Sequence, residues 1–128
     1  MTEQELFDRL KSEVSPDLEK AEDDFSSWDC ITHDEAAYIE LKCRRSHYDD
    51  LLIEKDKYDR LVKAAQYLNY NPVYINSTPQ GAWAFNLNYV QPEWEDRDGL
   101  PKTTDFENNE KVTKTVGYLN INRGVQLW

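Results

Sequence analysis

Residues 38–44, YIELKCR, are the stretch on which the interpretation of this sequence depends. Side chains alternate between the two faces of a strand, so this segment would present two different surfaces. One face is apolar and suited to a core: Ile39, Leu41 and Cys43. The other face carries ionisable groups in a row: Tyr38, Glu40, Lys42 and Arg44. We therefore expect a strand over residues 36–44 in which one face packs and the other is available for chemistry.

An earlier segment is expected to pair with this strand as a hairpin. Residues 25–32 also have the composition of a strand, and the polar residues 33–35 form the turn between the two. Asp29 stands in the first strand, where antiparallel pairing brings it beside Glu40 and Lys42. Two converging carboxylates form an oxygen-ligand site suited to Mg²⁺. The lysine can orient or deprotonate an attacking water, or stabilise charge on a phosphate, so the three residues supply the parts for metal-assisted phosphodiester hydrolysis.

The spacing of Glu40 and Lys42 is unusual within this chain. Nine lysines occur, and only Lys42 has an acidic residue two positions before it. The simpler interpretation is a solvated strand face on which Glu40 and Lys42 form an ion pair, which would add little to stability. Asp29 at hairpin distance favours a functional site over that reading.

Helices and further strands are expected around the hairpin. The spacing of apolar residues predicts one amphipathic helix over residues 2–14, which begins with a capping box formed by Thr2 and Glu5. It predicts a second helix over residues 56–69. The remaining expected elements are strands at 72–76 and 82–87 around a turn at 77–81, a long loop over 91–110 and a last strand over 111–121. Residues 17–24 are strongly acidic and show no clear pattern.

The order of these elements resembles the PD-(D/E)xK nuclease superfamily. The segments that carry the resemblance are WDCI at 28–31, YIELKCR at 38–44, KYDRLVKAA at 57–65 and PVYIN at 72–76. The resemblance covers residues 25–88, about half of the chain. It implies an α/β (α+β) fold in which a mixed central β-sheet is flanked by helices, known as the restriction-endonuclease-like core, within a single domain over residues 1–128.

The resemblance also implies roles for individual residues. Asp29 and Glu40 would bind Mg²⁺, or Mn²⁺ in its place, with help from the backbone carbonyl of Leu41. Lys42 would act on the attacking water and the scissile phosphate. Many members add an acidic residue from the first helix, for which Glu13 or Glu5 are the candidates. The resemblance thus implies a metal-dependent DNA endonuclease, of a phage or a repair and recombination type.

Three more basic residues near the motif are candidates for contacts with DNA phosphates: Arg44, Arg45 and Lys57. Each on its own could equally be an ordinary solvated charge. The two cysteines have no metal-ligand spacing, and neither histidine has a Cys or a second His at such a spacing. The sequence contains no apolar run long enough to span a membrane and no signal peptide, so we expect a cytoplasmic protein.

The net charge of −10 argues against binding to nucleic acid. Proteins that bind nucleic acid normally present a basic surface. The excess of acid is concentrated in residues 1–35, with twelve acidic and three basic residues, whereas residues 36–66 hold six and seven. Two alternatives follow: an acidic, non-catalytic interaction module or DNA mimic on the same fold, and a nuclease subunit that borrows its DNA-binding surface from a basic protein partner. Separately, so small a nuclease is expected to need two active sites to cut both strands, which favours a homodimer.

Overall fold

The strand with the ionisable row lies inside a six-stranded sheet. In the computed structural model, which describes residues 1–23, 26–101 and 110–128, this strand is β3 (Ala37–Cys43). It pairs antiparallel with β2 (Cys30–Thr32) and parallel with β5 (Asn71–Thr78). The sheet order is β1 (Glu19–Lys20), β2, β3, β5, β6 (Gly81–Asn86) and β9 (Val125–Gln126). The predicted mixed central sheet is confirmed.

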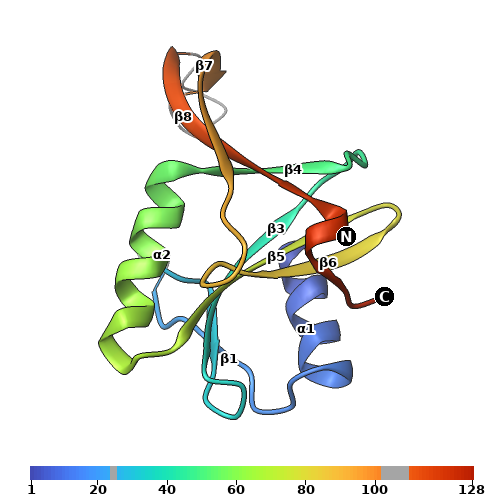
Figure 1. The fold of residues 1–128 in the computed structure, drawn as a ribbon. Helices are drawn as coiled ribbons and strands as arrows, with labels where there is room; N and C mark the ends of the chain where they lie inside the picture. The colour runs from blue at the N-terminus through green and yellow to red at the C-terminus, as the bar shows by residue number, and fades with distance from the viewer. Residues whose placement is uncertain (24–25, 102–109) are drawn as a thin grey trace.

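One helix covers each face of this sheet, and Figure 1 shows the sheet passing between them. The apolar face of β3 packs against α1 (Glu3–Glu13). The opposite face packs against α2 (Lys55–Leu68). The core on the α1 side is built mainly from Leu6, Phe7, Leu10, Ile39, Leu41 and Ile75, and the core on the α2 side mainly from Tyr38, Leu61, Ala65, Tyr74 and Phe85. The row of ionisable groups on β3 therefore shares its face with the α2 core.

Both helices begin and end as the sequence predicted, to within two residues. Thr2 caps α1, since its hydroxyl accepts from the Glu5 N–H at 3.1 Å and its own N–H donates to the Glu5 carboxylate at 3.0 Å. Asn69 ends α2 in the left-handed conformation, at φ 55°. No helix within the described ranges is long and apolar enough to cross a bilayer.

The crossover between β3 and β5 contains a strand that the sequence patterns did not reveal. This strand, β4 (Asp50–Glu54), leads directly into α2 and pairs with β8 (Lys111–Asn120). Leu51 and Ile53 are buried in the α2 core, while Asp50 is exposed. A β-α crossover of this kind lets β3 and β5 run parallel.

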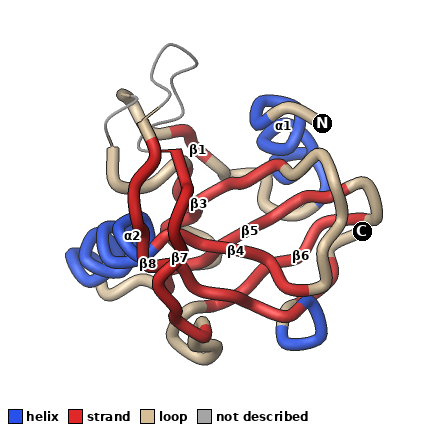
Figure 2. Tube along the Cα trace, turned by 90° about the horizontal axis from the view of Figure 1, so that it is seen from above, coloured by secondary structure: helices blue, strands red, loops and turns tan. Residues whose placement is uncertain are grey.

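The prediction of a loop over residues 91–110 is wrong for the first half of that range. Residues Glu93–Pro101 form β7, which pairs antiparallel with β8 in a three-stranded sheet of order β4-β8-β7. β7 is almost entirely exposed, so it carries no apolar alternation that a sequence pattern could show. Figure 1 shows β7 and β8 projecting from the body of the protein as a ribbon, and Figure 2 shows the same two strands side by side from above. Residues 102–109 of the predicted loop lie outside the described residues. A short 3₁₀ helix (Ile121–Arg123) follows β8.

The first strand of the predicted hairpin is shorter than expected. Only Cys30–Thr32 form β2, while Phe25 lies outside the described residues. Before Cys30 the ladder becomes irregular, because the Leu41 N–H is bonded to the side chain of Asp29. The predicted turn 77–81 is tighter than expected, since Thr78 pairs with Gly81. A Cβ at Gly81 would lie 2.4 Å from the Trp128 carbonyl oxygen, so only glycine fits against the tail there.

Candidate active site

Asp29 and Glu40 face each other across the β2–β3 hairpin. The regular register ends with the pair Cys30 and Ile39, and the side chains of the next residues, Asp29 and Glu40, share a hydrogen bond. The Asp29 N–H donates to the Ile39 carbonyl at 2.9 Å. Its carboxylate accepts from the Leu41 N–H at 2.7 Å. The backbone of β3 therefore fixes the orientation of the Asp29 side chain. The predicted site requires such an orientation, because both carboxylates must point toward the same position.

Glu40 is a partly buried carboxyl group whose pKa is strongly raised. Its side chain is only 14% exposed. Burial raises its pKa to about 8, and the negative charge of Asp29 adds to this effect. Lys57 on α2 opposes the shift, with its Nζ 3.7 Å from the Glu40 Oε1, and a hydrogen bond shared with Asp29 further favours the protonated form. Two carboxyl groups therefore meet here with too little positive charge to keep both ionised.

Lys42 lies two residues further along the same face of β3. Burial lowers its pKa, and the positive charges of Arg44 and Lys57 lower it further. Its amine makes no hydrogen bond or ion pair with any residue that the structure describes. With Glu40, Arg44 and Lys57 it lines a small hollow above Tyr74. The amine is thus half-buried, uncommitted and easier to deprotonate than an ordinary lysine.

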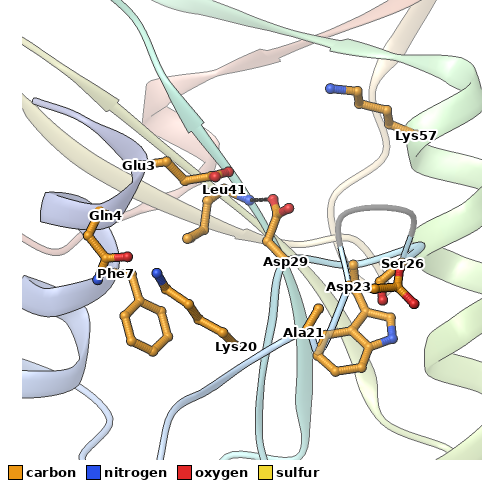
Figure 3. Close-up of a pocket in the computed structure, with 11 residues that line it drawn as sticks. Glu3, Gln4, Phe7, Lys20, Ala21, Asp23, Ser26, Asp29, Leu41 and Lys57 are labelled. Atoms are coloured by element: carbon orange, nitrogen blue, oxygen red, sulfur yellow. Dashed lines mark hydrogen bonds between the residues drawn. The ribbon is translucent and has the colours of Figure 1, made fainter.

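A third carboxylate reaches the site from α1, and the sequence analysis missed it. Glu3 and Asp29 line a cavity of about 540 Å³, and Figure 3 shows both carboxylates beside Leu41. Burial raises the pKa of Glu3, and the charge of Asp29 raises it further. The two acidic residues proposed for this role lie elsewhere: Glu5 caps the helix, and Glu13 pairs with Arg9 at 2.8 Å. The signal was available, because Glu3 shares the helical spacing of the buried Leu6, Phe7 and Leu10.

The three predicted phosphate-contacting residues are not equivalent. Lys57 belongs to the site itself, since it contacts Glu40 and lines the cavities on both sides of Asp29. Arg44 stands at the edge, where its Nη2 donates to the Leu52 carbonyl at 2.7 Å. Arg45 is exposed and lines a different cavity, beside Trp128. The structure therefore brings together Asp29, Glu40, Lys42 and Lys57, with Arg44 next to them and Arg45 apart.

The donor groups at this site fit a hard divalent cation. Mg²⁺ is typically held by one or two carboxylates and keeps other positions for water and substrate oxygens. A cation between Asp29 and Glu40 would relieve the repulsion that raises the Glu40 pKa. No group of three or more His, Cys, Asp and Glu side chains is arranged to hold a metal ion within residues 1–23, 26–101 and 110–128. The backbone carbonyl of Leu41 as a further ligand stays a prediction.

Comparison with known proteins adds a structural relative. No protein-family model and no curated protein matches the sequence. Among solved structures, the fold is similar to Hjc of Archaeoglobus fulgidus, a Holliday junction resolvase from an archaeal hyperthermophile. The TM-score is 0.63 with 14% sequence identity, over 98% of this chain and 88% of that chain. The chain therefore has the restriction-endonuclease-like fold of this resolvase, as the resemblance to PD-(D/E)xK nucleases implied.

Proposed function

We propose that this protein is a metal-dependent endonuclease that hydrolyses phosphodiester bonds in DNA. The observation that carries the proposal is the opposition of Asp29 and Glu40 across the hairpin, with the Lys42 amine on the same face of β3. A solvated ion pair, the simpler alternative, would leave Glu40 exposed and pair it with Lys42. Instead Glu40 is buried, its cationic neighbour is Lys57, and Lys42 is uncommitted.

Each residue has a distinct role in this proposal. Asp29 and Glu40 would hold Mg²⁺, which when bound neutralises phosphate charge and makes water more acidic. The Leu41 N–H keeps Asp29 in place before any ligand arrives. Lys42 can accept a proton from the attacking water or donate hydrogen bonds to the scissile phosphate, and its lowered pKa favours the first role. Glu3 would add a carboxylate from the α1 side, and Lys57 would contact a phosphate.

The nature of the substrate is proposed from the fold. The structural relative is a Holliday junction resolvase, which supports DNA as the substrate and recombination or repair as the setting. Cutting two strands of one DNA molecule needs two active sites. We therefore include a homodimer in the proposal, and a basic protein partner is the alternative source of DNA-binding charge.

Cleavage assays test the proposal directly. Supercoiled plasmid, single-stranded circular DNA and a synthetic four-way junction would be incubated with the protein in Mg²⁺, in Mn²⁺ and in chelator. We expect metal-dependent cutting by the wild type and by Lys63→Ala, an exposed lysine on the outer side of α2. Folded Asp29→Asn and Lys42→Ala should not cut. Equal cutting by Lys42→Ala and the wild type would refute the proposed site.

The net charge of −10 favours a second candidate, an acidic interaction module or DNA mimic on the same fold. Such a protein needs acidic residues spaced over its surface and has no use for a half-buried lysine beside buried carboxylates. It would bind no Mg²⁺ in calorimetry and cut none of the three DNAs. Together, those two results would make this candidate the better account.

A further inference from the structure

A second cavity, of about 630 Å³, lies beyond the end of β3, beside the turn between β5 and β6. Three of the six arginines of the chain line it: Arg9, Arg44 and Arg45. Thr78, Gln80 and the Trp128 ring complete much of the wall, and no Asp or Glu is among the described residues that line it. We call this cavity the arginine pocket. Figure 1 shows the turn that joins β5 to β6, whose residues contribute to this pocket, on the side where both chain ends lie.

The arginine pocket is assembled from distant parts of the sequence. Arg9 comes from α1, and its guanidinium lies over the Trp128 ring at 4.0 Å from the centroid. Trp128 is held against β6, because its carbonyl accepts from the Ala82 N–H at 3.2 Å and the Leu127 N–H donates to the Ala82 carbonyl at 2.8 Å. The Arg44 N–H donates to the Ser77 carbonyl at 2.8 Å, which fixes the chain where the two arginines leave the sheet.

The positive charge of the pocket is only partly neutralised. Arg9 pairs with Glu13 at 2.8 Å, but this is an exposed pair within one helix. Arg44 donates to a backbone carbonyl, which leaves its charge uncompensated. The Arg45 side chain has no hydrogen bond or ion pair with any described residue. In a chain with net charge −10, a cavity lined by three arginines and by no described Asp or Glu is suited to an anion, and arginine is the residue best matched to phosphate.

The arginine pocket is continuous with the candidate active site through one residue. Arg44 also lines the hollow that contains Glu40 and Lys42. Glu40, Lys42 and Arg44 are alternate residues along the strand direction, so Arg44 lies roughly 13 Å from Glu40 at about 3.3 Å per residue. That separation is too large for one phosphate to contact both Glu40 and Arg44, but a DNA strand can span it. A free nucleotide bound in the arginine pocket would give no reason for the pocket to adjoin the candidate active site.

We propose that the arginine pocket binds a backbone phosphate of the DNA substrate, a few nucleotides away from the bond that is cleaved. The inference rests on the proposed endonuclease function, because the substrate is the same DNA. Arg45 supplies the uncommitted guanidinium, Arg9 and Arg44 supply further positive charge, and the Gln80 side-chain amide supplies a further hydrogen bond. The pocket thereby gives an acidic protein a local basic path along which a strand can reach the carboxylates.

Equilibrium binding of fluorescently labelled DNA in chelator tests the pocket without cleavage. Arg45→Ala and Arg9→Gln would be compared with the wild type and with Arg97→Ala, an exposed arginine on β7 outside the pocket. Each pocket variant should weaken binding by about tenfold at low salt and reduce the slope of log K against log salt by about one. Arg97→Ala should match the wild type, and Arg45→Lys should recover part of the loss. Thermal melts would verify that each variant is folded.

The outcomes separate this inference from the proposed function. If the pocket variants bind DNA as tightly as the wild type, or if the wild type binds none, the inference is overturned whatever the cleavage assays show. If the wild type binds DNA through these arginines but never cuts it, the pocket stands and the proposed activity fails. Inorganic phosphate that competes at micromolar concentration would also overturn the inference, because the pocket would then be a site for a small free anion.

Discussion

The Leu41 N–H donates to the Asp29 carboxylate at 2.7 Å, so a side chain takes the place of a backbone carbonyl at the end of the β2–β3 ladder. This hydrogen bond has a structural role in addition to any role in metal binding. A strand N–H that loses its acceptor in a part-buried position costs free energy. Substitutions at Asp29 should therefore separate stability from activity.

Asp29→Ala should lower the free energy of unfolding by about 1–3 kcal/mol, because it leaves the Leu41 N–H without a partner. Asp29→Asn keeps an oxygen acceptor and should be much less destabilising. Both should abolish metal-dependent cleavage, since neither retains the negative charge. Urea denaturation monitored by tryptophan fluorescence gives the stabilities. Equal destabilisation by the two variants would show that the hydrogen bond is unimportant for the fold.

Glu40 should make the metal-free protein less stable as pH rises. Because its pKa is about 8 in the folded state and 4.5 in a model carboxyl, the native state binds more protons between these values. Its contribution to stability is therefore full below pH 4.5 and is lost progressively up to pH 8. Each pKa unit corresponds to about 1.4 kcal/mol, so Glu40→Gln should be more stable than the wild type in chelator at pH 8.

The stability difference between Glu40→Gln and the wild type should disappear near pH 4.5. Saturating Mg²⁺ at pH 8 should raise the melting temperature of the wild type but not that of the variant. The measurement is a set of thermal melts across this pH range, with and without metal. A difference that is constant with pH would mean that the pKa of Glu40 is the same in the folded and unfolded states.

Lys42→Arg distinguishes two roles of the Lys42 amine. Arginine retains the charge but cannot release a proton near neutral pH. If Lys42 exchanges a proton with the attacking water, the arginine variant should lose at least about a hundredfold in cleavage rate, close to Lys42→Ala. The lowered pKa of Lys42 favours that outcome. Recovery to within a few-fold of the wild type would assign the amine a purely electrostatic role.

Glu3 and Thr2 are neighbours on α1 with different expected effects. Glu3→Gln should weaken Mg²⁺ binding and slow cleavage with little change in stability, because the Glu3 side chain makes no hydrogen bond or ion pair with the described residues and lines the cavity with Asp29. Thr2→Ala should lower stability by about 0.5–2 kcal/mol through loss of the helix cap, with cleavage unchanged in the folded protein. Calorimetry with Mg²⁺ and chemical denaturation measure the two effects. If both variants changed Mg²⁺ binding and stability in the same way, Glu3 would have no role in metal binding.

The Tyr74 hydroxyl supports the floor of the site. It donates to the Leu52 carbonyl at 2.9 Å and accepts from the Asn76 side chain at 3.0 Å, and both side chains are buried. Tyr74→Phe should cost about 1–3 kcal/mol, because it leaves the buried Asn76 amide without its partner, while the Leu52 carbonyl still accepts from Arg44. Tyr67→Phe is the matched control, since that ring is 86% exposed and should have no effect. Denaturant titrations give the free energy of unfolding of the two variants. An equal value for both would show that the Tyr74 hydroxyl does not stabilise the fold.

The parts of the fold that the sequence predicted are those with one buried face. The apolar stripes of α1 and α2 and the alternation in β3 each follow from packing on one side, so periodicity was sufficient. β7 has no buried face and exists because its backbone pairs with β8, and Thr115 and Arg97 bond across the ribbon to Asp96 and Tyr118. Such a strand is determined by its partner rather than by its own pattern.

The same reasoning applies to the candidate site. Asp29, Glu40 and Lys42 lie within one hairpin, so a local pattern of spacing was enough to group them. Glu3 and Lys57 come from helices on opposite faces of the sheet, and only the packing angles of α1 and α2 bring them to Asp29. The position of Glu3 on the buried side of α1 could be predicted, but its distance from Asp29 could not.

The hairpin that holds both carboxylates also has a consequence for how the chain folds. β2 and β3 are joined by a short turn, so little chain entropy is lost when they pair. β4 and β8 are separated by most of the C-terminal half of the sequence, and their pairing encloses a far longer loop. We therefore expect the carboxylates to come together at an early, local step of folding, before the long-range contacts that complete the protein around them.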